Sequence, residues 1–554
     1  MSEYRMENRW FKNAVIYCLG VDTFRDGNGD GIGDFIGLRQ GLSYLAGLGV
    51  SCIWLLPFYK SPDRDDGYDI MDYLSVHPRL GDLGDFAAFM SEANDRGIRV
   101  IIDLVVNHTS DQHPWFQAAR RNDPKYHGYY VWRKDDPGDT SDQAVFPGKQ
   151  SGVWEFDKLA KAYYFHRFYS YQPDLNTGNP AVRDEIKKII GFWLALGVSG
   201  FRVDAAPFVI AYKGPDAEKQ PHESFEYLEE FREFLRWKTG DAILVAEANV
   251  APDQILNYFG ERGQRMTMVI NFFVNPHLFL AIAERSPEPI ERALRQLPQI
   301  PVLSHWAYFL RNHDELDLSR LSQAEREICF RAFGPKPNMQ IYERGIRRRL
   351  APMLSGRLDL QLLMYSLIFT IPGTPILWYG EEIGMGEDLN QEERNSVRSP
   401  MQWTADLNAG FSTADPSNLV RPVIDKGAFG YRKVNVQAQR RDPGSLLNYL
   451  ERMIRTRKEY PEFSTGTYRV VETSEPTKIF AHSCQDESGN AVIAVHNLTE
   501  GSMEVVIKLW EKTFDHFVHL FDQRPNEKIK KAEIGLELPA FGFSWLRLRQ
   551  KKQI

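Results

Sequence analysis

Two segments, RVIIDLVVNH (99–108) and VSGFRVDAAP (198–207), decide the fold class of this 554-residue chain. Each is a short run of aliphatic residues that ends in polar ones, and near-continuous apolar runs are typical of parallel strands buried on both faces. Six further segments of this kind alternate with helical stretches. The alternation predicts an α/β protein, a (β/α)8 TIM barrel, in which catalytic groups follow the strands. The strands are expected within residues 14–24, 50–57, 99–108, 198–206, 243–249, 266–273, 307–314 and 375–381.

Two parts of the chain depart from this alternation. A long stretch rich in Trp, Tyr, Asp and Gly follows the third strand, which indicates a small domain inserted over the barrel mouth. Near the C-terminus, segments such as TYRVVET (467–473) have the period-two pattern of antiparallel strands. The expected domains are the barrel (1–107 and 174–465), the inserted domain B (108–173) and a C-terminal antiparallel β-sandwich (466–554).

Composition limits the partners. The net charge is −7 and no long basic run occurs, which argues against nucleic acid and anionic membranes and indicates a small neutral substrate. Residues 1–15 lack the apolar core of a signal peptide, and no apolar run approaches the ~20 residues that span a bilayer. A cytoplasmic protein is expected, without an organic cofactor and with its four dispersed cysteines free and buried. The sequence leaves homo-oligomer formation open.

Polar residues follow four of the expected strands, where a barrel places its chemistry. Asp204 and Glu247 end neighbouring strands, and strands ~4.8 Å apart suit the ~5–5.5 Å carboxyl separation of a retaining glycosidase. Arg202 lies two residues before Asp204, on the same strand face, where its charge should keep that carboxyl ionised. The side chains expected to converge on one cleft are Asn107, His108, Arg202, Asp204, Glu247, His313 and Asp314.

The segments DLVVNH, GFRVDAAP, ILVAEAN and FLRNHDE, with QPDLN (172–176), resemble the signature regions of the alpha-amylase family of glycoside hydrolases, over residues 10–405. The resemblance implies that Asp204 is the nucleophile, Glu247 the proton donor and Asp314 the stabiliser of the transition state. It also implies that the subsite for the reacting glucose is lined by His108, Arg202 and His313.

Two further motifs resemble those of exo-acting members. In GYDI (67–70) and RSPMQW (398–403) the resemblance implies that Asp69 and Arg398 bind the non-reducing glucose and close the pocket behind it. Tyr68 is expected to stack under the same sugar. Ala205, after the expected nucleophile, resembles the residue of enzymes that prefer α-1,4 linkages.

Within the family, segments such as NHTSDQHPWFQ (107–117) and YYFHRFYSYQPDLN (163–176) most resemble trehalose synthases (maltose alpha-D-glucosyltransferases). This implies exchange of maltose and trehalose by intramolecular transglucosylation through a covalent β-glucosyl intermediate, with water excluded. The insert segment AVFPGKQSGVWEFD (144–157) looks more like that of α-glucosidases. The alternatives are therefore a hydrolytic or transglycosylating α-1,4-glucosidase and, more remotely, a non-catalytic glucosidase-like binding subunit.

The loop DGNGDGIGD (26–34) places oxygen donors at alternate positions, as in the first half of an EF-hand loop. It resembles a structural Ca²⁺ loop of related glucosidases. The alternative is a tight turn closed by hydrogen bonds. The expected ligands are Asp26, Asn28, Asp30, the Ile32 carbonyl and Asp34.

Overall fold

The structure is a computed structural model that describes residues 9–213, 222–521 and 527–550. Eight parallel strands close into a barrel in the order β1-β16-β12-β11-β10-β9-β5-β2, which confirms the predicted barrel. The barrel strands are β1 (Ile16–Leu19), β2 (Cys52–Leu55), β5 (Arg99–Leu104), β9 (Gly200–Val203), β10 (Ile243–Ala246), β11 (Met268–Ile270), β12 (His305–Phe309) and β16 (Thr374–Trp378).

The barrel strands are shorter than the apolar segments that predicted them. Nearly every strand residue is buried, because helices cover the outer face and packed side chains fill the inside. β9 ends at Val203 and β10 at Ala246, so the polar residues that follow belong to loops at one end of the barrel. Strands β12 and β16 begin two and one residues earlier than expected, at His305 and Thr374.

Local signals in the sequence fix several helix ends. Helix α2 begins after Asp34, whose carboxylate accepts a hydrogen bond from the Gly37 amide (2.6 Å), and is closed by Gly49, which takes the left-handed conformation just after the last helical residue. A capping box of Asp82 and Asp85 opens α3. The longer helices around the barrel are α2 (Phe35–Leu48), α3 (Leu83–Asp95), α5 (Pro180–Ala195), α7 (Glu226–Lys238), α8 (Pro252–Phe259), α9 (Val274–Glu284), α10 (Glu288–Gln296), α11 (Gln323–Phe333), α13 (Leu358–Thr370) and α15 (Leu446–Glu459).

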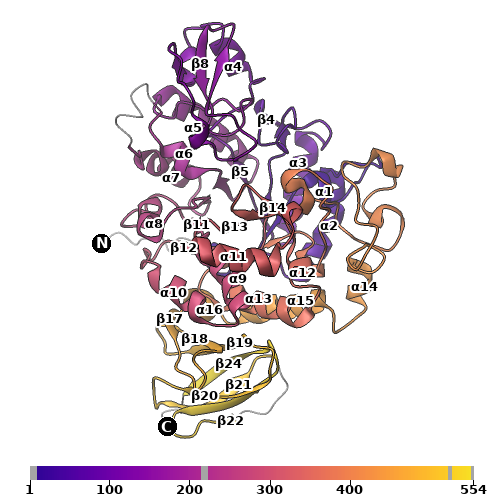
Figure 1. Ribbon diagram of the computed structural model, residues 1–554, viewed down its shortest axis with the longest axis vertical. Helices are drawn as coiled ribbons and strands as arrows, with labels where there is room; N and C mark the ends of the chain where they lie inside the picture. The colour runs from indigo at the N-terminus through magenta and orange to yellow at the C-terminus, as the bar shows by residue number, and fades with distance from the viewer. Residues whose placement is uncertain (1–8, 214–221, 522–526, 551–554) are drawn as a thin grey trace.

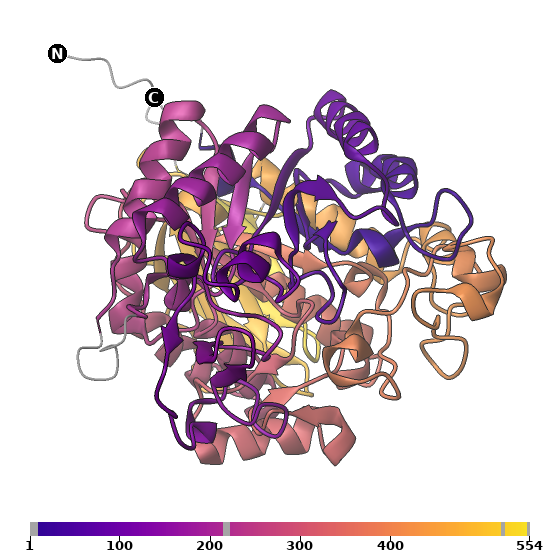
Figure 2. The same cartoon turned by 90° about the horizontal axis from the view of Figure 1, so that it is seen from above.

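A small antiparallel sheet lies between β5 and β9 in the chain. Its order is β6-β8-β7, with bounds β6 (Trp132–Arg133), β7 (Trp154–Asp157) and β8 (Ala162–Phe165), and the helix α4 (Pro114–Ala119) packs nearby. These elements stand at the top of Figure 1, and in Figure 2 they lie in front of the barrel. The insert therefore covers one end of the barrel.

The C-terminal strands form two antiparallel sheets at the opposite end of the molecule (Figure 1). One face of the larger sheet joins the barrel core through Trp545, which packs against Phe463 and Phe521 and donates a hydrogen bond to Ser366 Oγ (2.7 Å). The larger sheet has the order β17 (Thr467–Val470), β18 (Ile479–Gln485), β19 (Ala491–Asn497), β24 (Phe543–Gln550), β21 (Phe514–His519) and β22 (Glu527–Lys528); the smaller one pairs β20 (Met503–Lys508) with β23 (Glu533–Leu538).

Two expectations about the chain can be compared with this fold. The four cysteines are buried and free, as their spacing predicted. Within the described ranges, no helix has the length and apolar character needed to cross a bilayer.

The contact between barrel and C-terminal sheet is expected to depend on Trp545, which is 1% exposed. Trp545→Ala should lower the free energy of unfolding by about 3–5 kcal/mol, because it leaves a cavity and removes one of the two hydrogen bonds of the Ser366 hydroxyl group. Trp237→Ala is the control, since that side chain is 76% exposed and its loss should change stability by less than about 0.5 kcal/mol. Denaturant unfolding followed by circular dichroism measures both, and equal midpoints for the two variants would contradict the prediction.

Candidate active site

Loops at one end of the barrel bring the three expected catalytic carboxylates to one cavity. Asp204 follows β9, Glu247 follows β10, and Asp314 lies in the loop after β12. All three line a cavity of about 430 Å³, together with Tyr68 and His108. The volume lies in the range of sites for small molecules.

One buried arginine organises the carboxylates. Arg202 is 1% exposed, and its Nη1 lies 2.6 Å from Asp204 Oδ1 and 2.6 Å from Asp103 Oδ1. Its Nη2 lies 2.8 Å from Glu247 Oε2. The two terminal nitrogens of one guanidinium therefore hold Asp204 and Glu247 side by side, as the adjacent strands predicted.

Burial raises the pKa of these carboxyl groups. Burial raises the pKa of Asp204 to about 6, even though the charge of Arg202 acts in the opposite direction. The sequence predicted that the charge of Arg202 would keep the pKa of Asp204 low, but the effect of burial on this pKa is larger. Asp103 also has a pKa raised to about 6 by burial, and burial raises the pKa of Glu247. A raised pKa suits Glu247 as a proton donor.

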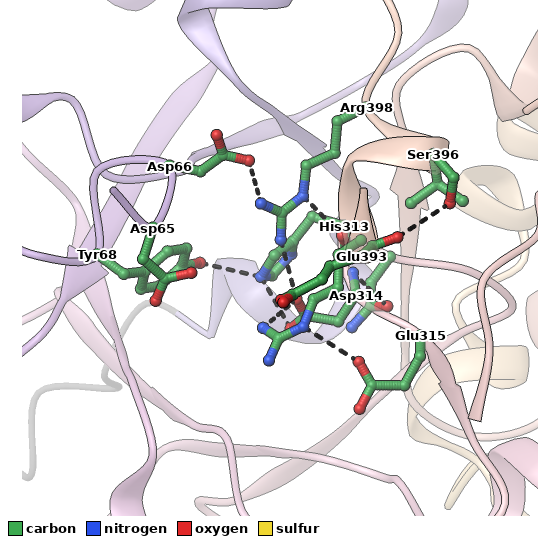
Figure 3. A network of polar contacts seen from close by, with 12 residues as sticks. Asp65, Asp66, Tyr68, His313, Asp314, Glu315, Glu393, Ser396 and Arg398 are labelled. Carbon is green, nitrogen blue, oxygen red and sulfur yellow. Dashed lines mark hydrogen bonds and ion pairs between the residues drawn. The ribbon is translucent and has the colours of Figure 1, made fainter. Parts of the chain in front are cut away.

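The pKa of Asp314 is lowered, in contrast to those of Asp204 and Glu247. Arg394 Nη1 and Arg398 Nη2 lie 2.8 and 3.0 Å from its Oδ1, and His313 Nε2 lies 3.1 Å from its Oδ2 (Figure 3). Burial alone would raise the pKa of Asp314, but these neighbours hold it well below its ordinary value. Burial lowers the pKa of His313, so the two arginines carry the positive charge at neutral pH. Asp314 is therefore ionised.

Tyr68 lines one wall of the cavity and His313 stacks behind it; His313 and Arg202, which were expected to line the glucose subsite, are buried behind the lining residues. The rings of Tyr68 and His313 stack 5.8 Å apart, and the Tyr68 hydroxyl lies 2.9 Å from His313 Nε2. His108 Nε2 lies 3.1 Å from the Tyr68 carbonyl oxygen, and burial lowers the pKa of His108 to about 4. Neutral His108 therefore donates its one N–H to this carbonyl oxygen and keeps Nδ1 as an acceptor.

The placement of Asp69 corrects the sequence prediction. Asp69 is 0% exposed and does not line the cavity, because its carboxylate accepts hydrogen bonds from Ser61 Oγ (2.8 Å) and from the amides of its own loop. Asp65, three residues before Tyr68, lines the cavity instead, and burial raises its pKa to about 7. Its Oδ2 accepts a hydrogen bond from Gln172 (2.8 Å).

Arg398, which was expected to bind the non-reducing glucose, does not line the cavity and lies behind Asp314. Its guanidinium pairs with Asp66, with Asp314 and with the His313 carbonyl oxygen (Figure 3). Asp66 also pairs with Arg421. Two acidic residues just before the GYDI motif therefore take the place expected for Asp69: Asp65 lines the cavity and Asp66 lies behind Arg398.

Further cavity residues were missed. Asn249 lies two residues after Glu247, a spacing that puts both on one face of an extended segment, and it accepts a hydrogen bond from Arg320 Nε (2.6 Å). Arg394 had no signal beyond its position four residues before Arg398. Phe146 and Phe168 come from the insert and give the cavity apolar wall.

The insert is anchored beside the site by a buried ammonium group. Lys213 Nζ lies 2.6 Å from Asn107 Oδ1 and 2.9 Å from Asp174 Oδ2, and Lys213 is 7% exposed. Asn107 precedes His108 and Asp174 begins the return to the barrel. Asn107 therefore binds this lysine and does not line the cavity.

The expected calcium loop is a chain of side-chain turns. Asp26, Asn28 and Asp30 each accept a hydrogen bond, through a side-chain oxygen, from the backbone amide two residues later. Asp and Asn side chains commonly form such local turns with their own backbone. Asp34 caps α2. The all-oxygen donor set fits Ca²⁺, but among described residues no group of three or more His, Cys, Asp or Glu side chains is placed to hold a metal ion. Calcium binding therefore remains a prediction.

The sequence of the chain matches a known protein family over most of its length. Residues 18–329 and 348–466 match the model of the alpha amylase catalytic domain. The chain is 40% identical to the trehalose synthase/amylase of Mycobacterium tuberculosis over 97% of this chain and 90% of that protein. It is 40% identical to the trehalose synthase of Pimelobacter over 98% and 96%, and 30% identical to the oligo-1,6-glucosidase of Parageobacillus thermoglucosidasius over 85% and 87%.

Solved structures share the fold over nearly the whole chain. The alpha-amylase from H. orenii superposes with a TM-score of 0.78 at 26% identity, covering 97% of this chain and 100% of that one. The trehalulose synthase of Pseudomonas mesoacidophila superposes with a TM-score of 0.75 at 26% identity, covering 98% and 99%.

Proposed function

Because the chain belongs to the alpha-amylase family of glycoside hydrolases, we propose that it interconverts maltose and trehalose by moving a glucosyl group within one bound disaccharide. The observation that carries the proposal is Arg202, which holds Asp204 and Glu247 on one guanidinium. Two neighbouring carboxyl groups are the machinery of a retaining glycosidase.

In the first step, Asp204 attacks the anomeric carbon of the non-reducing glucose while Glu247 gives its proton to the glycosidic oxygen. The bond from carbon to that oxygen breaks, a β-glucosyl ester forms on Asp204, and glucose is set free in the cavity. Asp314, ionised by its two arginines, binds the sugar hydroxyl groups most strongly as positive charge develops on the ring. Tyr68 and Asp65 line the same cavity and would hold the glucosyl unit.

In the second step, the released glucose turns and presents its anomeric hydroxyl. Glu247 takes the proton of that hydroxyl, the oxygen attacks the glucosyl carbon, and Asp204 leaves as carboxylate. The product is trehalose, with the configuration of the transferred carbon retained. Attack by water in place of glucose gives hydrolysis, so the outcome depends on how well the cavity excludes water.

A hydrolytic or transglycosylating α-1,4-glucosidase is the second candidate. It is favoured by relatives named as glucosidases, which are 30% and 31% identical to this chain. The same carboxylates perform both reactions, so the distinction lies in the loops. Relatives named as trehalose synthases are 40% identical, and this difference favours the isomerase.

The proposal predicts the products formed from maltose. Chromatography over time should show trehalose exceeding free glucose, while Asp204→Asn and Glu247→Gln should each lower turnover by about 10⁴-fold or more, as removal of a catalytic group does. Glucose without trehalose would establish the hydrolase instead. Appreciable turnover by either variant, with contamination excluded, would overturn the catalytic assignment.

The pKa values predict the pH profile. Asp204 attacks as a carboxylate, and its pKa is raised to about 6, so the nucleophile is lost as pH falls below that value. The kcat/KM should therefore fall below pH ~6 and approach a loss of about tenfold per pH unit. Circular dichroism at each pH controls for unfolding. A kcat/KM that stays level down to pH ~4.5 would contradict this electrostatic description.

We also propose that the loop 26–34 binds a structural Ca²⁺. At [Ca²⁺] near a hundred times the Kd, binding adds about 2.7 kcal/mol of stability, so a chelator should lower the melting temperature of a chain this long by about 2 °C and added calcium should restore it. Asp30→Ala should melt at the lower temperature with or without chelator, whereas magnesium should not replace calcium. No response of the unaltered protein to chelator, with no calcium found by elemental analysis, would refute the site.

A further inference from the structure

We propose that Glu393 is a positioning residue that seals the cavity against water and so sets how often the glucosyl group passes to sugar in place of water. The inference rests on the proposed glucosyl transfer and deepens it. We call Glu393 and its three partners, Lys149, Tyr169 and Tyr342, the clasp.

One carboxylate of the clasp joins three segments that are far apart in the chain. Glu393 Oε2 accepts hydrogen bonds from the hydroxyl groups of Tyr169 (2.6 Å) and Tyr342 (2.9 Å), and Oε1 lies 3.2 Å from Lys149 Nζ. Lys149 and Tyr169 belong to the insert, Tyr342 lies between the strands β14 (Gln340–Ile341) and β15 (Gly345–Ile346), and Glu393 follows β16. The clasp therefore fixes the insert to two loops of the barrel.

The carboxylate is ionised at neutral pH. Burial alone would raise the pKa of Glu393, but the hydrogen bonds from Tyr169 and Tyr342 and the contact with Lys149 lower it. Hydrogen bonds to a charged acceptor are about twice as strong as neutral ones. The Glu393 side chain is 26% exposed, so water competes only in part.

The clasp adjoins a wall of the cavity. Phe146, which lines the cavity and is 5% exposed, lies with its ring centre 4.8 Å from that of Tyr342 and 5.1 Å from that of Tyr169. The guanidinium of Arg394 lies 4.6 Å from the Phe146 ring and pairs with Asp314. Loss of the Glu393 contacts would free this aromatic wall, and water would enter, while Asp314 would keep its pairing with Arg398.

Glu393 itself is outside the cavity, while the nucleophile and the proton donor depend on Arg202. The first step, bond cleavage, should therefore survive its replacement. The second step, which is a competition between water and sugar for the ester on Asp204, should not. A residue with a merely structural role would change stability or the overall rate without changing this competition.

The test compares Glu393→Ala with the unaltered protein on p-nitrophenyl α-glucoside with added glucose. The glucosyl group of the donor carries the label. The amount of nitrophenol measures cleavage, and the amount of labelled free glucose measures transfer of the glucosyl group to water. Glu393→Ala should raise the fraction transferred to water by about fivefold or more, since small displacements of a positioned acceptor cost much larger factors. Nitrophenol release should stay within about twofold.

Two further variants complete the design. Tyr342→Phe removes one hydroxyl group from the clasp and keeps the ring, so it should raise the water fraction by a smaller factor even if Glu393→Ala does not fold. Glu392→Gln, an exposed neighbour in the same loop, should change nothing. An unchanged water fraction in folded Glu393→Ala, or in Tyr342→Phe if the first does not fold, overturns the proposal. If the unaltered protein makes no trehalose from maltose, only the proposed function is contradicted. The role of the clasp is still tested, because the experiment with added glucose measures the division of the glucosyl group between water and sugar.

Discussion

The contact on which the rest of the site depends is the buried guanidinium of Arg202 among three carboxylates. Asp103 on β5, Asp204 after β9 and Glu247 after β10 all bind it, so it joins the ends of three neighbouring strands. Buried charges are tolerated only when paired, which ties the position of each carboxylate to the arginine. The same burial raises the pKa of each carboxyl group, so the site combines paired charges with a proton held ready for transfer.

Around this centre, contacts distant in sequence decide what the cavity does. The two arginines that ionise Asp314 come from the loop after β16, and the apolar wall comes from the insert. In the proposed reaction, bond cleavage needs the centre and Asp314, whereas the fate of the glucosyl group depends on the apolar walls of the cavity. Family members with the same catalytic residues can therefore differ in product.

Sequence reasoning reached the centre because its signals are local. Apolar runs of strand length predicted the barrel, and the polar residues after them predicted Asp204, Glu247 and Asp314. The prediction was wrong where one loop contains several acidic residues and its conformation decides which of them reaches the cavity. Asp69 was expected there, but Asp65 lines the cavity and Asp69 is buried against Ser61. Glu393 had no signal, because its partners lie in the insert and in the loop between β14 and β15.

The most direct measurement is mass spectrometry of the protein after reaction with 5-fluoro-α-glucosyl fluoride, a substrate whose ring fluorine slows the second step more than the first. If Asp204 is the nucleophile, one sugar adduct should accumulate, map to the peptide that contains Asp204, and disappear when glucose is added as acceptor. An adduct on another carboxylate, or turnover that never passes through an adduct, would contradict a covalent transfer at this site.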